Sequence, residues 1–146
     1  MSLEGEYRDD NIFAKIIRGE APAVRVYEDP DVLSIMDLFP QSPGHLLVLP
    51  KRDRARNLLD ADAVVLSKLI VVVQDLTEAV RRALQPDGIM VAQFNGEASG
   101  QTVYHLHFHV IPRWAGQPLK GHGHGQMADL AELRRQAEKI AAALPK

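Results

Sequence analysis

The segment GQTVYHLHFHVIPRW, from Gly100 to Trp114, decides how this 146-residue chain is interpreted. It contains three of the six histidines of the chain, His105, His107 and His109, at every second position. Side chains two residues apart share a face of a β-strand, whereas in a helix they diverge by roughly 200°. The segment is rich in Val, Tyr, Phe and Ile and is closed by Pro112, which favours a strand.

The predicted strand has one polar and one apolar face. The apolar face is expected to pack in the core, and the histidine face to line a ligand site, a metal site or a polar cavity. Repulsion between neighbouring imidazolium groups keeps at least one ring neutral near neutral pH, and its lone pair can bind a metal or attack an electrophile. The polar face carries Val103, His105, His107 and His109, and the apolar face Tyr104, Leu106, Phe108 and Val110.

Three interpretations of the histidine face stay open from the residues alone. Alternating histidines on a strand can present zinc ligands, with His45 as a further ligand from elsewhere in the chain. One histidine can instead act as a nucleophile or an acid–base catalyst while the others orient it. The third interpretation is a structural network of polar groups in the core.

Composition indicates one soluble globular domain spanning residues 1–146, with 46% hydrophobic and 25% charged residues. A net charge of −2 argues against a broad basic surface for nucleic acid. The chain has no cysteine, which excludes disulfides, thiolate metal sites and a cysteine nucleophile. No apolar run approaches the roughly 18 residues of a membrane span, and the first ten residues do not resemble a signal segment. We therefore expect a cytoplasmic protein that does not bind membranes.

Hydrophobic periodicity predicts an α+β fold. A sheet of about five mainly antiparallel strands, a long crossover helix and a C-terminal helix account for the pattern. Helices are expected over residues 8–20, 60–84 and 128–144, and strands over 23–29, 32–38, 45–50 and 89–94 in addition to the histidine strand. No phosphate-binding glycine fingerprint of the P-loop or dinucleotide-binding type is present.

The loop NGEASGQT, residues 95–102, leads into the histidine strand. Gly96 and Gly100 allow close approach of the backbone to a ligand, and the Gln101 amide and the Thr102 hydroxyl are donors suited to a phosphoryl oxygen. A plain hairpin turn is the alternative. Asp37 ends a strand, where its carboxylate can accept hydrogen bonds from two ribose hydroxyls or simply begin a turn.

Two polar segments are less informative. His122 and His124 lie in the glycine-rich stretch HGHG, which is interpreted as a solvated loop in preference to a weak metal site. The basic stretch PKRDRAR, residues 50–56, is interpreted as the solvated start of a loop, with steering of an anionic substrate as the alternative.

HLHFHVI, residues 105–111, resembles the His-φ-His-φ-His-φ-φ signature of the histidine triad (HIT) superfamily. The resemblance extends to residues 11–52 and 95–113, most closely in the Hint-like and related prokaryotic branch, and thus covers a core of about 11–113. Residues 114–146 form a C-terminal extension that does not match. The resemblance implies a HIT-like fold and a homodimer with the predicted 60–84 helix at its interface. It implies no metal and no other cofactor.

The same resemblance assigns roles to individual positions. His107 matches the family nucleophile, which attacks the α-phosphorus to give a nucleotidyl-histidine. His109 matches the histidine that touches the phosphate, His105 the one that supports the strand network, and His45 a histidine behind the nucleophile. Asp37 matches the ribose-binding carboxylate. The base pocket corresponds to Ile12, Phe13, Ile16, Ile35 and Leu38, and the phosphate and leaving-group loop to Asn95, Gln101 and Thr102.

The implied activity is hydrolysis of purine nucleoside 5′-phosphoramidates. The alternatives are a dinucleoside polyphosphate hydrolase of the Fhit-like branch, a nucleotide- or partner-binding protein with little activity, and a metal-binding protein using His45 and the triad. Some prokaryotic members hold a structural zinc through a Cys-x-x-Cys pair. Asn11 and Ala14 stand at those positions here, so we expect no such zinc site.

Overall fold

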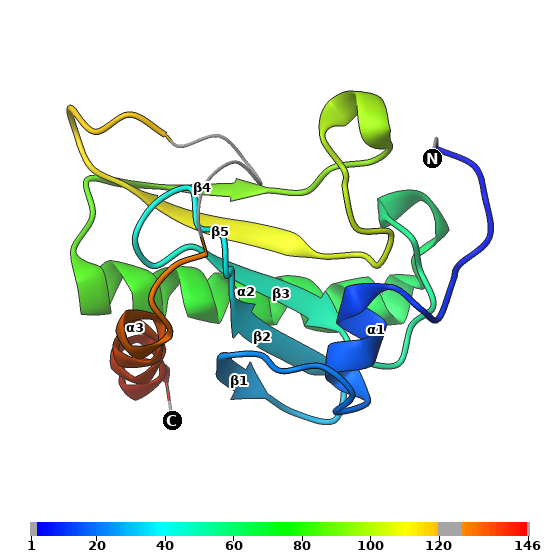
Figure 1. The fold of residues 1–146 in the computed structure, drawn as a ribbon, viewed down its shortest axis with the longest axis horizontal. Helices are drawn as coiled ribbons and strands as arrows, with labels where there is room; N and C mark the ends of the chain where they lie inside the picture. The colour runs from blue at the N-terminus through cyan, green and yellow to red at the C-terminus, as the bar shows by residue number, and fades with distance from the viewer. Residues whose placement is uncertain (1–2, 120–126, 146) are drawn as a thin grey trace.

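A computed structural model describes residues 3–119 and 127–145 and confirms the α+β class. Its five strands form one sheet of order β1-β2-β3-β5-β4, in which every neighbouring pair is antiparallel (Figure 1). The strands are β1 (Arg25–Glu28), β2 (Val32–Met36), β3 (Leu46–Pro50), β4 (Gly88–Ala92) and β5 (Phe108–Arg113). The α-helices are α1 (Ile12–Ile17), α2 (Ala63–Leu84) and α3 (Leu130–Ala142). None of the helices in the described residues is long and apolar enough to cross a membrane.

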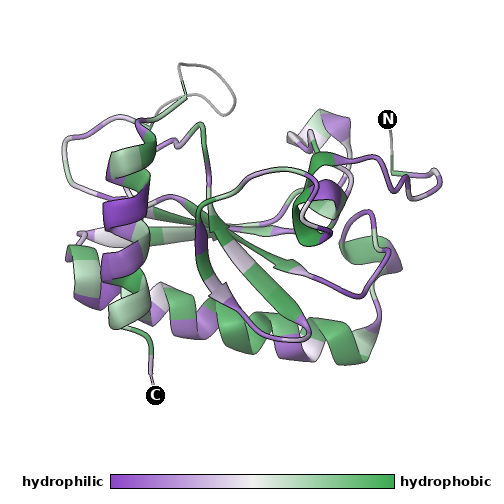
Figure 2. Ribbon diagram, turned by 60° about the horizontal axis from the view of Figure 1, so that its bottom comes forward, coloured by the Kyte–Doolittle hydropathy of each residue, from purple (hydrophilic) through white to green (hydrophobic). Residues whose placement is uncertain are grey.

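Both faces of the sheet are covered. Helices α2 and α3 pack on one face, and α1 lies over the other, at one end of β2 and β3 (Figure 1, Figure 2). Every residue of β2 and β3 is buried because alternate side chains enter the two cores. Val32, Met36, Leu46, Val48 and Val110 belong to the core under α2 and α3, whereas Leu33, Ile35, Leu47 and Leu49 belong to the core under α1.

The long helix begins three residues later than predicted. Residues Leu58–Asp60 form a 3₁₀-helix closed by reciprocal capping of Asn57 and Asp60, so Asp60 belongs to this turn and not to the long helix. Asp62 then caps α2 by accepting hydrogen bonds from the Val64 and Val65 N–H groups. At the other end Gln85 adopts a left-handed conformation with φ 52°, and the chain turns toward β4.

The histidine strand is shorter than predicted. Strand β5 begins at Phe108, because the Leu106 N–H donates to the Ala55 carbonyl instead of joining a ladder. His105 and His107 therefore precede the strand, with His105 in a bend of the backbone. The strand also continues through Pro112, although this proline was predicted to end it. Pairing with β3 stops at Val110, so Pro112 lies where β5 has β4 as its one neighbour, and a missing N–H is tolerated there.

Helices α1 and α3 are also shorter than predicted, at both of their ends. Asn11 accepts a hydrogen bond from the Ala14 N–H to start α1, and Gly19 follows the helix with φ 80°. Asp129 caps α3, so this helix starts at Leu130, whose side chain is 37% exposed instead of entering the core.

Candidate functional site

A cavity of about 240 Å³ lies on the α1 side of the sheet, beside the histidine segment. Its wall is almost entirely apolar, with Asp37 and Thr102 as polar exceptions next to the imidazoles of His107 and His109. Seven residues assigned to substrate by resemblance line it: Ile12, Phe13, Ile16, Ile35, Asp37, Leu38 and Thr102. Val103 also lines it, as expected for the histidine face, and the residues that sequence reasoning missed are Pro22, Ala23, Met36, Phe39 and Leu47.

The His107 ring has a defined tautomer. Its Nδ1 lies 2.7 Å from the carbonyl oxygen of His105, which accepts hydrogen bonds and cannot donate them, so Nδ1 carries the proton. The lone pair of the neutral ring is consequently on Nε2. The edge-on ring of Phe13, with centroids 4.8 Å apart, packs against the imidazole and fixes its plane. The His107 ring is thus held in one orientation at the wall of an apolar cavity.

His45 and His109 form a directed hydrogen-bond relay behind the His107 ring. The Gln41 N–H donates to His45 Nδ1 at 3.0 Å, so the His45 proton is on Nε2. Nε2 lies 2.9 Å from His109 Nδ1, which therefore accepts, and the His109 proton is on its own Nε2. His109 thus carries a ring N–H donor beside the His107 ring, whose centroid is 5.0 Å away. A lone pair on one ring and an N–H on the next suit attack on a phosphorus atom and binding of its oxygens.

Asp37 lies where β2 ends and stands next to this relay. Its Oδ1 accepts the Phe39 N–H at 2.8 Å, and its Oδ2 is 3.4 Å from His45 Nε2. The side chain is 12% exposed at the cavity wall, so one carboxylate edge faces the cavity space. A carboxylate in this position can accept hydrogen bonds from ligand hydroxyls.

The C-terminal extension supports the loop that carries Asp37 and His45. From α3, the Gln136 side chain accepts the Gly44 N–H at 3.2 Å. The Ala128 N–H, just before α3, donates to the Leu38 carbonyl at 2.9 Å. Gly44 has φ 86°, and a Cβ there would approach Leu84 Cδ1 to 2.3 Å, so this turn requires glycine. Ala128 and Gln136 of the C-terminal extension therefore support the site.

Asn95 and Gln101 lie outside the cavity lining in the described structure. The Gln101 amide donates to the Arg56 and Val103 carbonyls and accepts from the Gly96 N–H and the Asn57 amide. The Asn95 amide oxygen accepts the Leu58 N–H at 2.9 Å, and its NH₂ group donates to Gln93. Both side chains hold the loop itself together, and Thr102 is the member of the trio that reaches the cavity.

The basic stretch 50–56 is less solvated than predicted. Arg56 is 2% exposed, because its guanidinium lies over the Tyr104 ring and donates to the Leu3 carbonyl. Lys51 and Arg54 pair with Glu28 and Asp9. His122 and His124 fall outside the described residues.

Among the described residues, one group of side chains could hold a metal, namely Asp37, His45 and His109, whose ligand atoms lie within 4.8 Å of one another. The set proposed from sequence, His45 with all three triad histidines, is not brought together. In this group His45 Nε2 and His109 Nδ1 share a hydrogen bond. A metal there would have to replace that bond.

The HIT domain family model matches residues 18–116, which contain all three triad histidines and His45. The chain belongs to the HIT family. A HIT-like protein from Bartonella henselae, described as involved in cell-cycle regulation, is 52% identical in a crystal structure that superposes with a TM-score of 0.89 and covers 96% of this chain and 100% of that one. Its similarity includes the C-terminal extension.

Two further relatives were found by sequence similarity. An uncharacterized HIT-like protein of Mycobacterium tuberculosis is 41% identical over 108 residues, which is 74% of each chain. The adenylylsulfatase HINT3 of Arabidopsis thaliana is 36% identical over 121 residues, covering 79% of this chain and 61% of that protein. The HIT protein described here thus belongs to a superfamily of nucleotide-binding hydrolases and transferases.

Proposed function

We propose that this HIT protein hydrolyses purine nucleoside 5′-phosphoramidates through a covalent intermediate on His107. The observation that carries the proposal is the His107 tautomer: the His105 carbonyl holds the proton on Nδ1 and leaves the Nε2 lone pair beside the apolar cavity. The apolar wall fits a purine base, and Asp37 at its rim fits the ribose hydroxyls.

The reaction then runs in two displacements. His107 Nε2 attacks the α-phosphorus, the phosphorus–nitrogen bond of the substrate breaks, and the amine leaves after gaining a proton. Water next attacks the same phosphorus, the bond to Nε2 breaks with its electron pair returning to the ring, and the nucleoside monophosphate is released. The His109 Nε2–H is available to a phosphoryl oxygen in both steps.

The leaving group is the part of the substrate that the cavity constrains least. The relative in Arabidopsis is an adenylylsulfatase by name, so sulfate is one leaving group to test, and a nucleotide, as in dinucleoside polyphosphates, is another. All three substrates would present the same nucleotidyl group to His107. They differ in the group expelled, which makes them suitable for a ranking by kcat/KM.

The test is release of AMP from adenosine 5′-phosphoramidate in excess chelator, with wild type beside His107→Ala. We expect turnover by the wild type and a loss of about 10⁴-fold or more in the variant, because the covalent route is removed. Turnover in chelator counts against the metal-binding alternative. If the wild type releases AMP from none of the three substrates, a nucleotide-binding protein with little activity becomes the better account.

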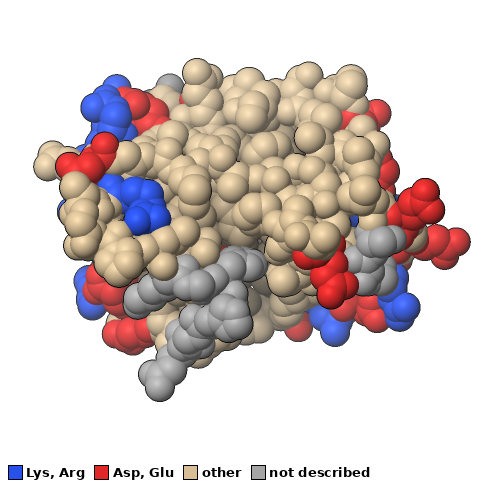
Figure 3. Space-filling model, turned by 90° about the horizontal axis from the view of Figure 1, so that it is seen from above, with Lys and Arg blue, Asp and Glu red and all other residues tan. Residues whose placement is uncertain are grey.

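A homodimer is part of the proposal. β4 is an edge strand, with Met90 and Val91 37% and 44% exposed, and α2 exposes Ile70 and Val71 at 50% and 53%. Seen from the β4 side, the described surface has a broad central area without charged side chains, bordered by charged ones (Figure 3). An exposed apolar area next to an open sheet edge fits a second copy of the chain.

Light scattering after size exclusion tests the dimer. We expect twice the chain mass for the wild type and for Leu130→Glu, a control that adds one glutamate to an exposed apolar site on α3. Val91→Glu combined with Ile70→Glu is expected to give the monomer mass. A monomeric wild type, or a double variant that stays dimeric, would contradict this arrangement.

A further inference from the structure

The N-terminal segment, residues 3–9, lies outside the matched HIT domain yet is tied to the triad. We call residues 3–9 the N-terminal arm. At its start the Leu3 carbonyl accepts a hydrogen bond from the buried Arg56 at 3.2 Å. Gly5 follows against the same guanidinium, which a Cβ at that position would meet at 3.1 Å. The arm is thus seated on the protein at its beginning.

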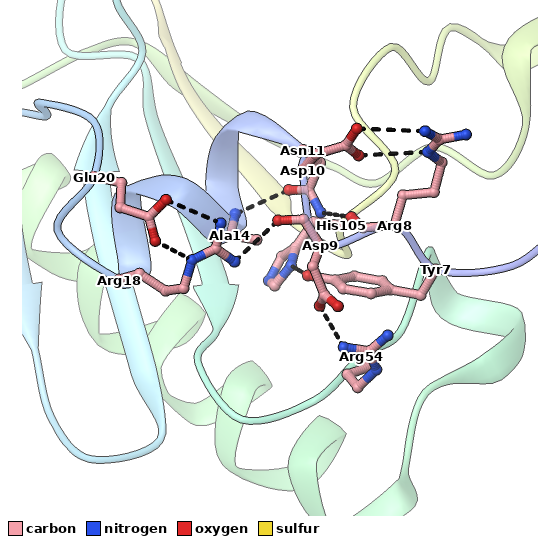
Figure 4. Close-up of polar contacts among 10 residues, drawn as sticks. All are labelled: Tyr7, Arg8, Asp9, Asp10, Asn11, Ala14, Arg18, Glu20, Arg54 and His105. Atoms are coloured by element: carbon pink, nitrogen blue, oxygen red, sulfur yellow. Dashed lines mark hydrogen bonds and ion pairs between the residues drawn. The ribbon is translucent and has the colours of Figure 1, made fainter.

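Tyr7 is the point where the arm reaches the triad. Its hydroxyl oxygen is 2.6 Å from His105 Nδ1, and the two rings are in edge contact with centroids 5.7 Å apart (Figure 4). The Arg54 guanidinium lies 4.9 Å from the centroid of the Tyr7 ring and also pairs with Asp9. Arg18 donates to the Asp9 carbonyl at 2.9 Å. The arm is therefore held on both sides of Tyr7, by Arg56 at Leu3 and by Arg54 and Arg18 at Asp9.

The direction of the Tyr7 hydrogen bond follows from the other side of the His105 ring. His105 Nε2 lies 2.8 Å from the Pro50 carbonyl oxygen, which can only accept, so the proton of the neutral ring is on Nε2. Nδ1 then carries the lone pair, and the Tyr7 hydroxyl donates to it. His105 is 1% exposed, and burial lowers the pKa of its ring, which favours the neutral form.

The same residue controls the nucleophile through its backbone. The His105 carbonyl oxygen accepts the Nδ1–H of His107 at 2.7 Å. His105 lies outside regular strand structure, so its position depends on side-chain contacts more than on the β5 ladder. Its ring is fixed between Tyr7 on one side and Pro50 on the other. A shift of the ring would move the carbonyl that orients His107.

We propose that Tyr7 is a positioning residue: by donating to His105 it locks the carbonyl that holds His107 in its reactive tautomer. The N-terminal arm is then part of the catalytic support, although it lies outside the HIT domain match. The kinetic consequence rests on the proposed role of His107 as nucleophile. The structural consequence, a fixed tautomer of His105 and His107, does not depend on any substrate.

Tyr7→Phe isolates the hydroxyl, because the ring, its contact with His105 and the Arg54 interaction are retained. We expect kcat for the phosphoramidate to fall about fivefold, as one net hydrogen bond of roughly 1 kcal/mol is lost from the oriented state, with KM within about twofold. Arg54→Gln, which loosens the arm and keeps the hydroxyl, should give a smaller fall of about twofold to threefold.

Tyr27→Phe is the matched control. Its hydroxyl donates to Asp29 at the same 2.6 Å, but at the end of β1 away from the cavity lining. We expect this variant to keep the kcat of the wild type at temperatures where both variants are folded. A fall in kcat of equal size in the two variants would overturn the proposal, because it would trace to stability.

Nitrogen-15 NMR of the imidazoles tests the proposal without substrate. The wild type should show His105 with its proton on Nε2 and His107 with its proton on Nδ1, each as a single tautomer. Tyr7→Phe should shift the His105 Nδ1 signal while the Pro50 carbonyl keeps the proton on Nε2, and it should change the His107 signal; Tyr27→Phe should give the wild-type spectrum. If Tyr7→Phe leaves both histidines unchanged, the proposal fails, whatever substrate the enzyme uses.

Discussion

Two regions flank the triad, and they use their side chains in opposite ways. The wall made by α1, β2 and the turn after β2 presents side chains to an open cavity. In the loop from Asn95 to Gln101, the side-chain amides instead form hydrogen bonds with the backbone of the loop and with residues 56–58. Residue type alone does not separate the two, because a donor suited to phosphate is equally suited to a carbonyl of the chain. Burial and the identity of the partner decide the role.

The sharpest way to break this comparison is a pair of alanine substitutions, Gln101→Ala in the loop and Ile12→Ala in the wall. Gln101 is 3% exposed and satisfies four partners, so its loss should lower the free energy of unfolding by about 2–4 kcal/mol. Ile12 is 47% exposed, so its loss should change stability by less than about 1 kcal/mol but raise KM about fivefold.

Urea unfolding and steady-state kinetics on both variants decide the matter. A Gln101→Ala protein with wild-type stability and a strongly raised KM would mean that this side chain binds the ligand. An Ile12→Ala protein with unchanged KM would remove α1 from the binding wall.

Asp37 sharpens the comparison within the wall itself. Asp37→Asn keeps an acceptor for the Phe39 N–H but weakens acceptance from ribose hydroxyls, so KM for the ribonucleotide should rise about tenfold. A 2′,3′-dideoxy substrate should bind the wild type and the variant equally, since it lacks those hydroxyls. Kinetics of the four enzyme–substrate combinations measure the coupling, and an equal penalty on both substrates would place the ribose elsewhere.

The smallest expected effect concerns His105, which is enclosed like Gln101. Burial holds its pKa below the ordinary value of 6.5, so the unfolded chain binds the proton more readily than the folded protein. The neutral ring therefore contributes stability above about pH 6.5, and this contribution is lost as pH falls toward and through the folded pKa. Urea unfolding between about pH 7 and pH 5 should show a steeper loss of stability in the wild type than in His105→Asn. Parallel profiles would mean that the ring is not held neutral.

Much of this arrangement was predictable from local patterns. Apolar runs predicted β2 and β3, the predicted helix over residues 8–20 contained α1, and the spacing of the histidines put His107 and His109 on the cavity side. The wall residues came from resemblance, and seven of them line the cavity. Phe39 was missed although it directly follows Asp37 and Leu38 in the sequence, because an exposed aromatic residue in a turn has no periodic signal.

Other features depend on contacts between segments far apart in the sequence. Tyr7 contacts His105 across 98 positions, and Gly44 contacts Gln136 across 92. Neither contact can be predicted from a local sequence pattern. The same holds for Pro112, which is tolerated because β3 ends before reaching it. Arg56 was predicted to be solvated. Its burial could not be foreseen, because it depends on contacts with Tyr104 and with the N-terminal arm.

The most direct test of the central claim, that His107 Nε2 attacks the α-phosphorus, is to trap the intermediate. Wild-type protein is mixed with adenosine 5′-phosphoramidate, quenched in alkali, which preserves phosphorus–nitrogen bonds, and mapped by mass spectrometry. The account predicts an adenylyl group on His107, none on His105 or His109, and no adduct in His107→Ala. An adduct on another residue, or AMP release by His107→Ala at the wild-type rate, would contradict it.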